Sequence, residues 1–410
     1  MNTRLRIKHF GPIQEGFTDT NGWLEINKLT ILIGNQGSGK STVAKVFSTL
    51  SWLEKALVRG QFTERGTNVE KLKELFTYQN IEDYFKPNSL IEYEGSAYYI
   101  YYSNQQLSIS KSEKNGYHFP KIMYIPSERN LVSTVTNVRK LEGLPQTLYT
   151  FADEYFKAAD YSKSSIDIPL NNIKFDYPTS DEPGKINGED FTLELPKASS
   201  GLQSFIPLYV VLRYLNEIIT TQLFTNVADR NLEKQKLLRE EIRKIYSNPS
   251  FSEQVKEAML EEVSKKFIYD ALINIIEEPE QNLFPDSQNK LLDVLFSFNN
   301  SGISNKLIIT THSPYLIGYT GLAIQAGELR KKVTDPKVLE RLFNIIPHTS
   351  TLEASEVVIY QLDEKTGTID KLSSDHGIPS GENYLNLYLQ KGNELFDRML
   401  EIEQEMNYGG

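Results

Sequence analysis

The segment from Gly34 to Thr42 (GNQGSGKST) constrains the fold of this chain more than any other. It matches the pattern G-x-x-x-x-G-K-[ST] and follows a continuously apolar run at residues 29–33. An apolar helical pattern begins directly after it, at Val43. The order strand, glycine-rich loop and helix is the context in which this pattern binds phosphate. A layered α/β core is therefore expected, because a continuously apolar strand must be covered on both faces.

The residue types of this loop suit a nucleoside triphosphate with a magnesium ion. Glycines let the backbone approach the phosphates, and the start of the following helix adds a dipole that favours anions. We expect Lys40 to reach the β- and γ-phosphates and the Ser41 hydroxyl to bind Mg²⁺. The residues expected to contact the nucleotide are Gly34, Asn35, Gln36, Gly37, Ser38, Gly39, Lys40, Ser41 and Thr42.

A second apolar run, at residues 271–276, ends in the acidic sequence Glu277-Glu278-Pro279-Glu280. Tips of parallel strands are where α/β sheets hold ligands. We expect Glu277 to hold magnesium through water, and Glu278 to orient and deprotonate the water that attacks the γ-phosphate. The alternative is an exposed acidic turn after a strand.

Two further segments extend this set of motifs. A third apolar run, at residues 307–311, is followed by His312, which we expect to donate to a γ-phosphate oxygen. Ser200 and Gly201 open a helical run at residues 204–215, and the start of a helix is an anion site. Ser200, Gly201 and Gln203 are therefore candidates for a second grip on the γ-phosphate; a simple helix cap is the alternative.

Composition excludes several chemistries. The 410 residues include no cysteine, which rules out disulfides, thiolate nucleophiles and iron–sulfur clusters and fits a reducing cytoplasm. Neither a signal peptide nor an apolar run long enough to span a membrane is present. The net charge of −10 argues against a surface that wraps nucleic acid as a whole, although a local basic groove stays possible.

The segments between the motifs differ in character. Residues 91–125 are rich in tyrosine and in short strand patterns, which predicts a β-rich arm. Residues 229–267 predict a helical hairpin, with one apolar set at Leu238, Ile242 and Ile245. The second set lies after the break at Asn248-Pro249-Ser250 and consists of Val255, Met259 and Val263. The apolar face of this hairpin packs either on its own domain or on a second copy.

Together these motifs resemble the ATP-binding-cassette (ABC) head shared by RecF, SMC-type and OLD-type ATPases. The resemblance rests on the opening strand at residues 5–13, the run at residues 277–285 and the switch histidine within residues 311–314. It implies ATP as the nucleotide and a head-to-head dimer, in which ATP on Lys40 of one chain is sealed by Ser200 and Gly201 of the other. The expected fold class is an α/β ABC-ATPase head, with a mixed sheet flanked by helices, a β-rich arm and a helical-hairpin insertion.

The chain departs from the pattern of this family at several positions. Glu277 stands where many relatives carry Asp, Leu202 replaces the second glycine of the signature, and Phe284 replaces a frequent His. The segment Tyr124–Asn130 occupies the place of a Q-loop but has no glutamine. The expected organisation is an ATPase lobe at 1–90, the β-rich arm at 91–197, the signature helix at 198–228, the hairpin at 229–267, a second ATPase lobe at 268–320 and an α/β tail at 321–410.

The function of such a head depends on what it drives. A transporter subunit is disfavoured by the unusual signature and by the 158 residues, from Thr42 through Ser199, that precede Ser200. OLD-type relatives often carry a Toprim nuclease, but no D-x-D pair follows His312. We hypothesise an ATPase that controls an effector on another chain, a nuclease or a toxin, in bacterial anti-phage defence.

Two alternatives stay open at this stage. One is a RecF-like repair ATPase that clamps DNA, for which the basic helix around Arg330, Lys331, Lys332, Lys337 and Arg341 is the best local candidate. A solvated helical face explains these residues better than a nucleic-acid site does. The other alternative is a scaffold in which ATP has a mainly structural part.

Overall fold

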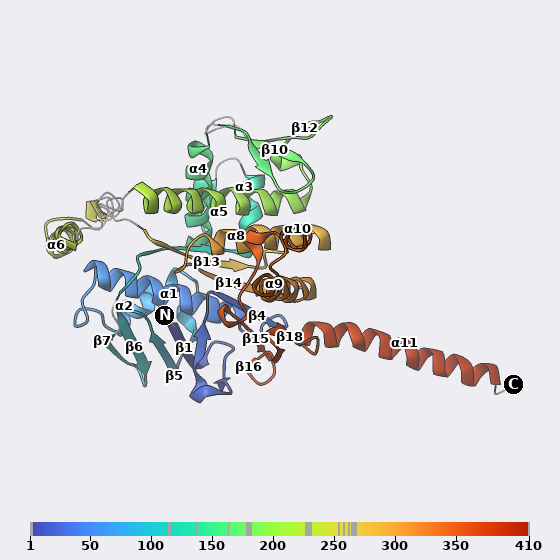
Figure 1. Cartoon of the computed structure of the whole chain (residues 1–410). Helices are drawn as coiled ribbons and strands as arrows, with labels where there is room; N and C mark the ends of the chain where they lie inside the picture. The colour runs from blue at the N-terminus through green and yellow to red at the C-terminus, as the bar shows by residue number, and fades with distance from the viewer. Residues whose placement is uncertain are drawn as a thin grey trace.

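The protein is organised around a seven-stranded central sheet with the strand order β2-β16-β15-β4-β14-β13-β8 (Figure 1). The structure is a computed structural model that describes residues 3–113, 116–135, 138–162, 164–177, 183–225, 232–252, 255–256, 259–260, 263 and 269–408. The strands of this sheet are β2 (Gly16–Phe17), β4 (Leu29–Gly34), β8 (Pro120–Ile125), β13 (Ala271–Glu277), β14 (Lys306–Thr311), β15 (Val357–Leu362) and β16 (Thr368–Lys371). The five strands from β15 to β8 run parallel, whereas β16 is antiparallel to β15.

Both faces of the central sheet are buried, as the continuously apolar strands predicted. Along β4, Ile31 and Ile33 belong to one hydrophobic cluster and Leu32 to another. β13 alternates in the same way, with Ile276 in the first cluster and Ile275 in the second. Because successive side chains of a strand point to opposite faces, a strand that is apolar throughout needs cover on both sides. This mixed α/β architecture confirms the expected fold class.

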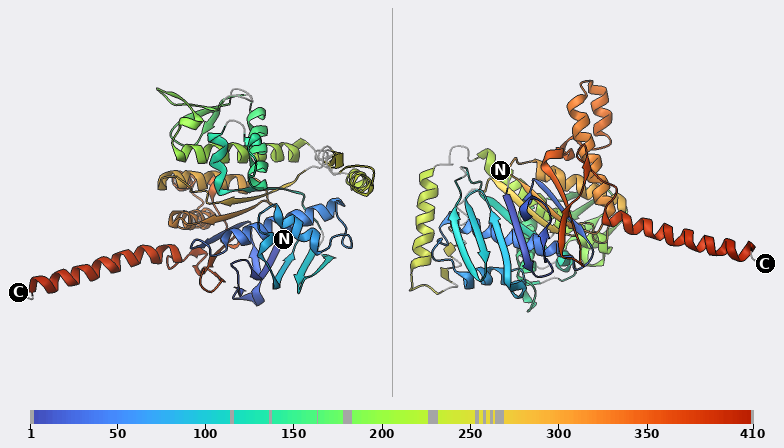
Figure 2. Two further views of the ribbon diagram at one scale, coloured as in Figure 1. Left: turned by 180° about the vertical axis from the view of Figure 1, so that it is seen from behind. Right: turned by 90° about the horizontal axis from the view of Figure 1, so that it is seen from below.

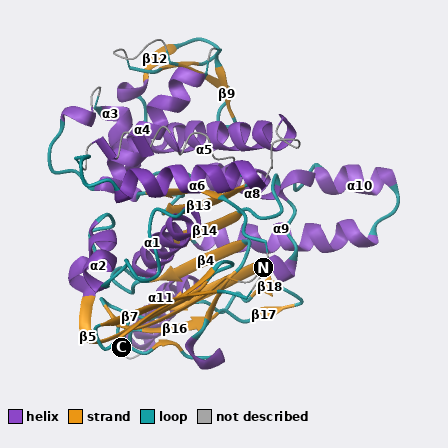
Figure 3. Ribbon diagram, turned by 90° about the vertical axis from the view of Figure 1, so that its left-hand side faces the viewer, coloured by secondary structure: helices purple, strands orange, loops and turns teal. Residues whose placement is uncertain are grey.

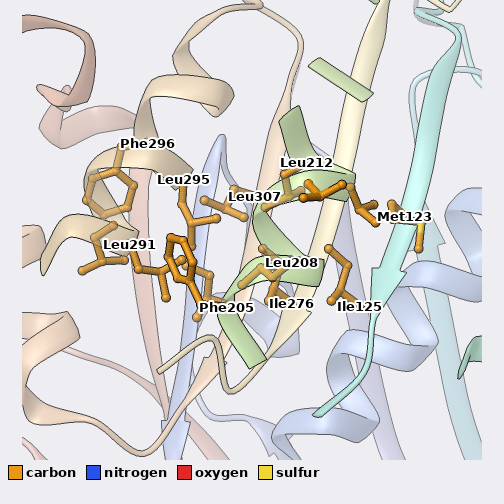
Figure 4. Packing of buried hydrophobic residues seen from close by; sticks show 14 of the residues in the cluster. Met123, Ile125, Phe205, Leu208, Leu212, Ile276, Leu291, Leu295, Phe296 and Leu307 are labelled. Carbon is orange, nitrogen blue, oxygen red and sulfur yellow. The ribbon is translucent and has the colours of Figure 1, made fainter. Parts of the chain in front are cut away.

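Helices α5 (Ser200–Thr225), α8 (Pro285–Asn300) and α9 (Pro314–Lys332) cover the first face of the sheet. Figure 4 shows how side chains of α5 and α8 meet those of the strands. The labelled residues of this contact are Phe205, Leu208, Leu212, Leu291, Leu295, Phe296, Met123, Ile125, Ile276 and Leu307. The short helix α3 (Leu131–Thr134) and helix α4 (Gln146–Tyr161) pack against α5.

The second face is covered by α1 (Lys40–Arg59), which lies between the central sheet and a five-stranded antiparallel sheet. The strands of that sheet are β3 (Leu24–Ile26), β1 (Thr3–Phe10), β5 (Phe85–Glu94), β6 (Tyr98–Ser103) and β7 (Gln106–Lys111), in spatial order. The tyrosine-rich strands expected in an arm therefore extend the sheet that contains β1. Tyr93 and Tyr102 are buried in its core, so these two aromatic rings serve packing. Helix α2 (Val69–Thr77) covers one end of this lobe.

Two insertions lie outside these layers. Strands β9 (Ile166–Ile168), β10 (Ile173–Asp176), β11 (Lys185–Asn187) and β12 (Thr192–Glu194) form a small antiparallel sheet near α4 and α5 (Figure 3). Helix α6 (Leu232–Ser247) is the first helix of the expected hairpin, and its apolar set packs with Phe119 of its own chain. Much of the second helix of that prediction, after residue 252, lies outside the described residues.

The C-terminal part returns to the central sheet and then leaves it. β15 lies beside β4, α10 (Pro336–Phe343) packs near α9, and β17 (Ser374–Asp375) pairs with β18 (Ile378–Pro379). Figure 2 shows that the last helix, α11 (Tyr384–Tyr408), projects away from the rest of the protein. Of the helices that the structure describes, none combines the length and the apolar character that crossing a bilayer requires.

Candidate nucleotide-binding site

The phosphate-binding loop joins the end of β4 to the start of α1, as the sequence predicted. Gly34 and Gly39 have φ angles of 150° and 100°, which side chains rarely adopt. A Cβ atom on Gly34 would lie 2.4 Å from the carbonyl oxygen of Leu362, and one on Gly39 would lie 2.4 Å from Cδ1 of Ile13. The loop therefore needs glycine at both positions, because β15 and the turn after β1 press against it.

The Lys40 side chain turns back onto this loop. Its Nζ donates to the carbonyl oxygens of Gly34 at 3.0 Å and Asn35 at 2.8 Å. Burial lowers the pKa of Lys40 to about 8, against the opposing influence of Glu278 and other nearby carboxylates. A bound phosphate would supply the negative charge that this buried ammonium lacks.

Another buried polar atom of the loop indicates that an anion fits here. The Ser38 hydroxyl is fully buried and has no hydrogen-bond partner in the described structure. Such groups are costly to bury unless a ligand or water completes them. Thr42 is also buried, whereas Asn35, Gln36 and Gly37 are exposed at the mouth of the loop and Ser41 is half-buried. The nine predicted loop residues thus form one continuous cradle.

Glu277 and Glu278 lie at the tip of β13, next to β14. The end of β13 and the acidic turn after it are called the Walker B motif and the Walker B turn below. Glu277 is buried, whereas Glu278 is half-buried and has a φ angle of 42°. The Glu278 carboxylate lies 3.4 Å from Nε2 of His312. Contact with His312, more than the attraction of Lys40, holds the pKa of Glu278 below its usual value. The structure therefore brings the predicted base and the predicted switch histidine into direct contact.

Glu280 connects the turn after β13 to the end of β14. Its Oε1 accepts hydrogen bonds from the Thr311 hydroxyl at 2.7 Å and from the His312 backbone N–H at 2.8 Å. Burial raises the pKa of Glu280 despite these hydrogen bonds. The sequence pattern predicts no part for Glu280 beyond its place in the acidic run. The structure shows that it fixes the backbone at His312.

Arg129 is the functional residue that sequence reasoning missed. It lies in the 3₁₀ helix η3 (Ser127–Asn130), is fully buried, and donates to the backbone of the turn after β13. Its Nη1 lies 2.8 Å from the carbonyl oxygen of Glu277, and its Nη2 lies 2.7 Å from that of Glu278. Burial lowers the pKa of Arg129 to about 10, so the side chain stays charged at neutral pH. No local pattern around this arginine signals such a part.

The signature residues lie at a different place, at the start of α5. A Cβ atom on Gly201 would lie 2.7 Å from the carbonyl oxygen of Asn282, just after the Walker B turn. The Gln203 amide donates to the carbonyl oxygens of Pro196 at 2.9 Å and Ala198 at 3.1 Å, which caps this turn within the chain. Among the described residues, no hydrogen bond or ion pair joins Ser200, Gly201 or Gln203 to the phosphate loop.

A magnesium ion suits the residues that face the loop. No group of three or more His, Asp or Glu side chains in the described part of the chain forms a metal site by itself. Mg²⁺ is usually held by one or two protein oxygens together with substrate phosphates and waters. Ser41 and Glu277 offer such a pair, so the residues fit the ion only together with a nucleotide.

The sheet order, the loop and the Walker B tip define a P-loop ATPase of the RecF, SMC and ABC type. A family model described as the AAA ATPase domain matches residues 61–317, and the chain belongs to that family. The match begins after the phosphate loop, so it rests on the part of the chain that carries the signature, the acidic tip of β13 and all of β14. No curated protein matches the sequence.

Solved structures similar to the chain include heads and cassettes. The SMC head domain from Thermotoga maritima is 10% identical, with a TM-score of 0.35, and the match covers 91% of this chain and 99% of that one. An SMC head bound to the C-winged helix domain of ScpA is also 10% identical, with a TM-score of 0.37 and coverage of 91% and 98%. A nucleotide-free ATP-binding cassette of an ABC transporter is 13% identical, with a TM-score of 0.27 and coverage of 92% and 94%. At these values the likeness says nothing about activity.

Proposed function

We propose that this protein binds and hydrolyses ATP with Mg²⁺ as cofactor, and that it does so as a dimer of heads. The observation that carries the proposal is the contact between Glu278 and His312 at 3.4 Å, close enough to Lys40 for the carboxylate and the ammonium to influence each other's pKa. A base, a phosphate ligand and a hydrogen-bond donor thus converge on one tip of the sheet.

Each residue of this tip has a distinct part in the proposed reaction. Lys40 leaves the loop carbonyls and binds the β- and γ-phosphates. Ser41 and Glu277 hold the metal ion, which neutralises phosphate charge when bound. Glu278 orients the attacking water and accepts its proton, while His312 donates to a γ-phosphate oxygen. Since Glu280 and Arg129 fix the backbone on both sides, Glu278 keeps its position during the exchange.

Replacing the proposed base separates binding from hydrolysis. Glu278→Gln keeps the shape of the side chain but cannot accept a proton, so we expect ATP turnover to fall by about 100-fold or more with nucleotide affinity retained. Phosphate release and a fluorescent-nucleotide titration measure the two quantities. Glu82→Gln, in the 3₁₀ helix that precedes β5, is the control. Unchanged turnover in Glu278→Gln contradicts the assignment of the base.

The second part of the proposal is that Ser200 and Gly201 act on the ATP of a second copy. In support, neither residue forms a hydrogen bond or ion pair with the phosphate loop of its own chain in the part that the structure describes, whereas Gly201 packs on Asn282 beside the turn after β13. Glu278→Gln with ATP should therefore accumulate a dimer in light scattering, and Ser200→Arg should prevent it. A monomer under all conditions contradicts this part.

We further propose that the head controls an effector on another chain, a nuclease or a toxin, in the cytoplasm and in anti-phage defence. The absence of cysteine suits a reducing compartment. Copurification with the products of neighbouring genes tests for the effector. Cleavage of DNA by this purified protein alone, without ATP, contradicts the proposal.

The DNA-clamping alternative gains little from the basic residues at 330–341. The single basic helix expected there is wrong, because α9 ends at Lys332 and Lys337 and Arg341 lie on the separate helix α10. Lys331 pairs with Glu328 at 2.9 Å and with Glu353, and Arg330 donates to the Thr351 hydroxyl. Carboxylates therefore neutralise part of this face and compete with DNA phosphates. Salt-dependent, ATP-stimulated duplex binding by the protein alone is the result that supports the alternative. Negligible turnover by wild-type protein is the result that supports a scaffold.

A further inference from the structure

A cavity of about 430 Å³ lies beside the C-terminal half of α1 and contains a buried ammonium group. The Lys55 side chain is only 6% exposed, and its Nζ donates to the carbonyl oxygen of Pro120 at 3.3 Å. The charged groups that most influence it are Arg59 and Lys121, both cations. Burial, reinforced by these two cations, holds the pKa of Lys55 well below its usual value. This ammonium therefore lacks the anion that a buried charge requires.

Among the residues that the structure describes, the other charged groups around the cavity do not supply that anion. Glu74 is the acidic residue among those that line it, but its side chain is 66% exposed and pairs with Lys71. Glu154 lies behind the wall and pairs with Lys121 at 2.9 Å. Lys55 and Arg59 are one helical turn apart on α1, so their charges add on the same face. The cavity is consequently positive.

Aromatic side chains form the remaining walls. Trp52 and Tyr78 line the cavity, and the Tyr269 ring lies 5.6 Å from Nζ of Lys55. Pockets of this volume hold small organic ligands, and aromatic walls suit planar rings. We propose that the cavity is a second ligand site, which binds a small organic anion of mononucleotide size with its phosphate or carboxylate between Lys55 and Arg59.

One wall of the cavity is shared with the ATP site. Tyr124 lines the cavity and pairs in register with Ile275, on the strand that ends in Glu277. Side chains two residues apart on a strand share a face, so Glu277 projects toward the same side as Ile275. Burial, and after it the nearby Glu277 carboxylate, holds the pKa of Tyr124 well above its usual value. A ligand in the cavity therefore contacts a neighbour of the proposed magnesium ligand; this consequence rests on the proposed function, whereas binding itself does not.

The test uses AMP and inorganic phosphate as probes on the full chain with Lys40→Ala, which removes the cation of the phosphate loop. We expect AMP, and more weakly phosphate, to raise Tm in this background. Adding Lys55→Met should weaken AMP binding about tenfold or more, since a charge-assisted contact is lost. It should also raise the Tm of the ligand-free protein, because it removes a buried amino group that has no anionic partner among the described residues. A lysine with a purely structural part predicts a lower Tm instead.

Lys306→Met is the matched control. Lys306 is a half-buried lysine on β14 whose pKa burial lowers to about 8; it donates to the carbonyl oxygen of Ile26 at 2.6 Å and lies outside this cavity. It should leave AMP binding unchanged. Equal stabilisation of the Lys40→Ala and Lys40→Ala/Lys55→Met proteins by AMP, or none in either, overturns the proposal. If Lys40→Ala does not fold, wild-type protein saturated with ADP serves as the background.

A separate observation concerns α11. Tyr388, Leu395, Met399, Ile402 and Met406 are all exposed on this helix, with exposed fractions of 49% to 78%. Their spacings of seven, four, three and four residues repeat the a and d positions of a heptad. A single apolar helix that projects into water is marginally stable by itself. Its apolar stripe needs a covering helix.

The charges beside the stripe identify the occupant as a second copy. With Met399 at position a, Arg398 falls at position g and Glu403 at position e of the next heptad. In a parallel pair of helices these two positions meet across the interface. Neither side chain forms an ion pair within the described part of its own chain. We infer that α11 pairs in parallel with α11 of a second copy, with Arg398 of each facing Glu403 of the other.

A cysteine-free chain makes this pairing easy to test. Ile402→Cys places one thiol at a d position, and oxidation without nucleotide should give a disulfide-linked dimer. Gln404→Cys, on the opposite face, is the control and should stay monomeric. Gly392→Leu fills the one a position that lacks a side chain and should strengthen the dimer in light scattering. Equal cross-linking of Ile402→Cys and Gln404→Cys overturns the pairing. Because nucleotide is absent, this result is independent of the ATP-dependent head dimer.

Discussion

The phosphate-loop half of the site and the signature half are built in opposite ways. Around Lys40, the ammonium is buried and bonds to loop carbonyls, and the buried Ser38 hydroxyl lacks a partner within the described structure, so the site is incomplete until an anion arrives. At the start of α5, Gln203 satisfies its own turn and Gly201 packs on Asn282. The difference teaches that the phosphate-loop half needs a ligand to complete it, whereas the signature half is already complete within one chain, as the proposed contact with a second copy requires.

Removing the cation of the first half should have the largest effect. Lys40→Ala leaves the γ-phosphate without its charge-assisted partner, so nucleotide affinity should fall by about 100-fold. A fluorescent-nucleotide titration measures it. Lys45→Ala, one turn along the same helix, is the control and should bind normally. If Lys40→Ala binds nucleotide normally, the phosphate-loop half is not the part that binds nucleotide, and the comparison of the two halves fails.

The signature half should respond in turnover rather than in binding. Gly201→Ala introduces a Cβ atom 2.7 Å from the carbonyl oxygen of Asn282, which must shift the start of α5. We expect hydrolysis to fall by about tenfold or more while one chain still binds ATP, because only the dimer is affected. Gly318→Ala, which meets open space, is the control. A loss of nucleotide affinity as large as that of Lys40→Ala refutes the division into two halves.

Arg129 supports the backbone of the turn after β13. Arg129→Met removes the side-chain donor to the carbonyl oxygens of Glu277, Glu278 and Pro279, at about 1–3 kcal/mol for each group that neither water nor another donor reaches. The Glu278 oxygen still accepts from the Gln281 backbone N–H. We expect a lower Tm together with slower turnover. Thermal unfolding and phosphate release measure both, and Arg213→Met, on the partly exposed face of α5, is the control. Full activity in Arg129→Met means that the turn after β13 keeps its conformation without the Arg129 side chain.

The pH dependence of ATP binding should give the smallest effect. In the free protein the Lys40 pKa is about 8, below the usual value for lysine. Bound phosphate favours the charged form, so affinity is complete below pH 8 and falls by at most about tenfold per unit above it. Titrations between pH 7 and pH 9.5 test this. Lys40→Met should bind weakly but without this slope; a flat wild-type profile contradicts the assigned cause.

The sequence predicted those parts of the site that are local in the chain. The glycines of residues 34–42 predict the phosphate loop. The polar residues that end two apolar runs predict the tips of β13 and β14. Arg129 could not be predicted, because its partners lie about 150 residues away and are carbonyl groups that any sequence carries. The tyrosine-rich strands were read as an arm for the same reason: their pairing with β1 depends on contacts that span about 80 residues.

The root of α11 is tied to the phosphate loop. The Tyr384 backbone N–H donates to the side chain of Gln361 at 2.9 Å, on β15, and Leu362 of that strand pairs with Gly34. A helix of 25 residues is about 37 Å long. A small rotation at the start of α11, beside the proposed ATP site, is therefore amplified along the helix. A tilt of about 10° there moves the far end by about 6 Å. Small changes beside the γ-phosphate would appear as a change of distance between two labels at the tips of a paired α11.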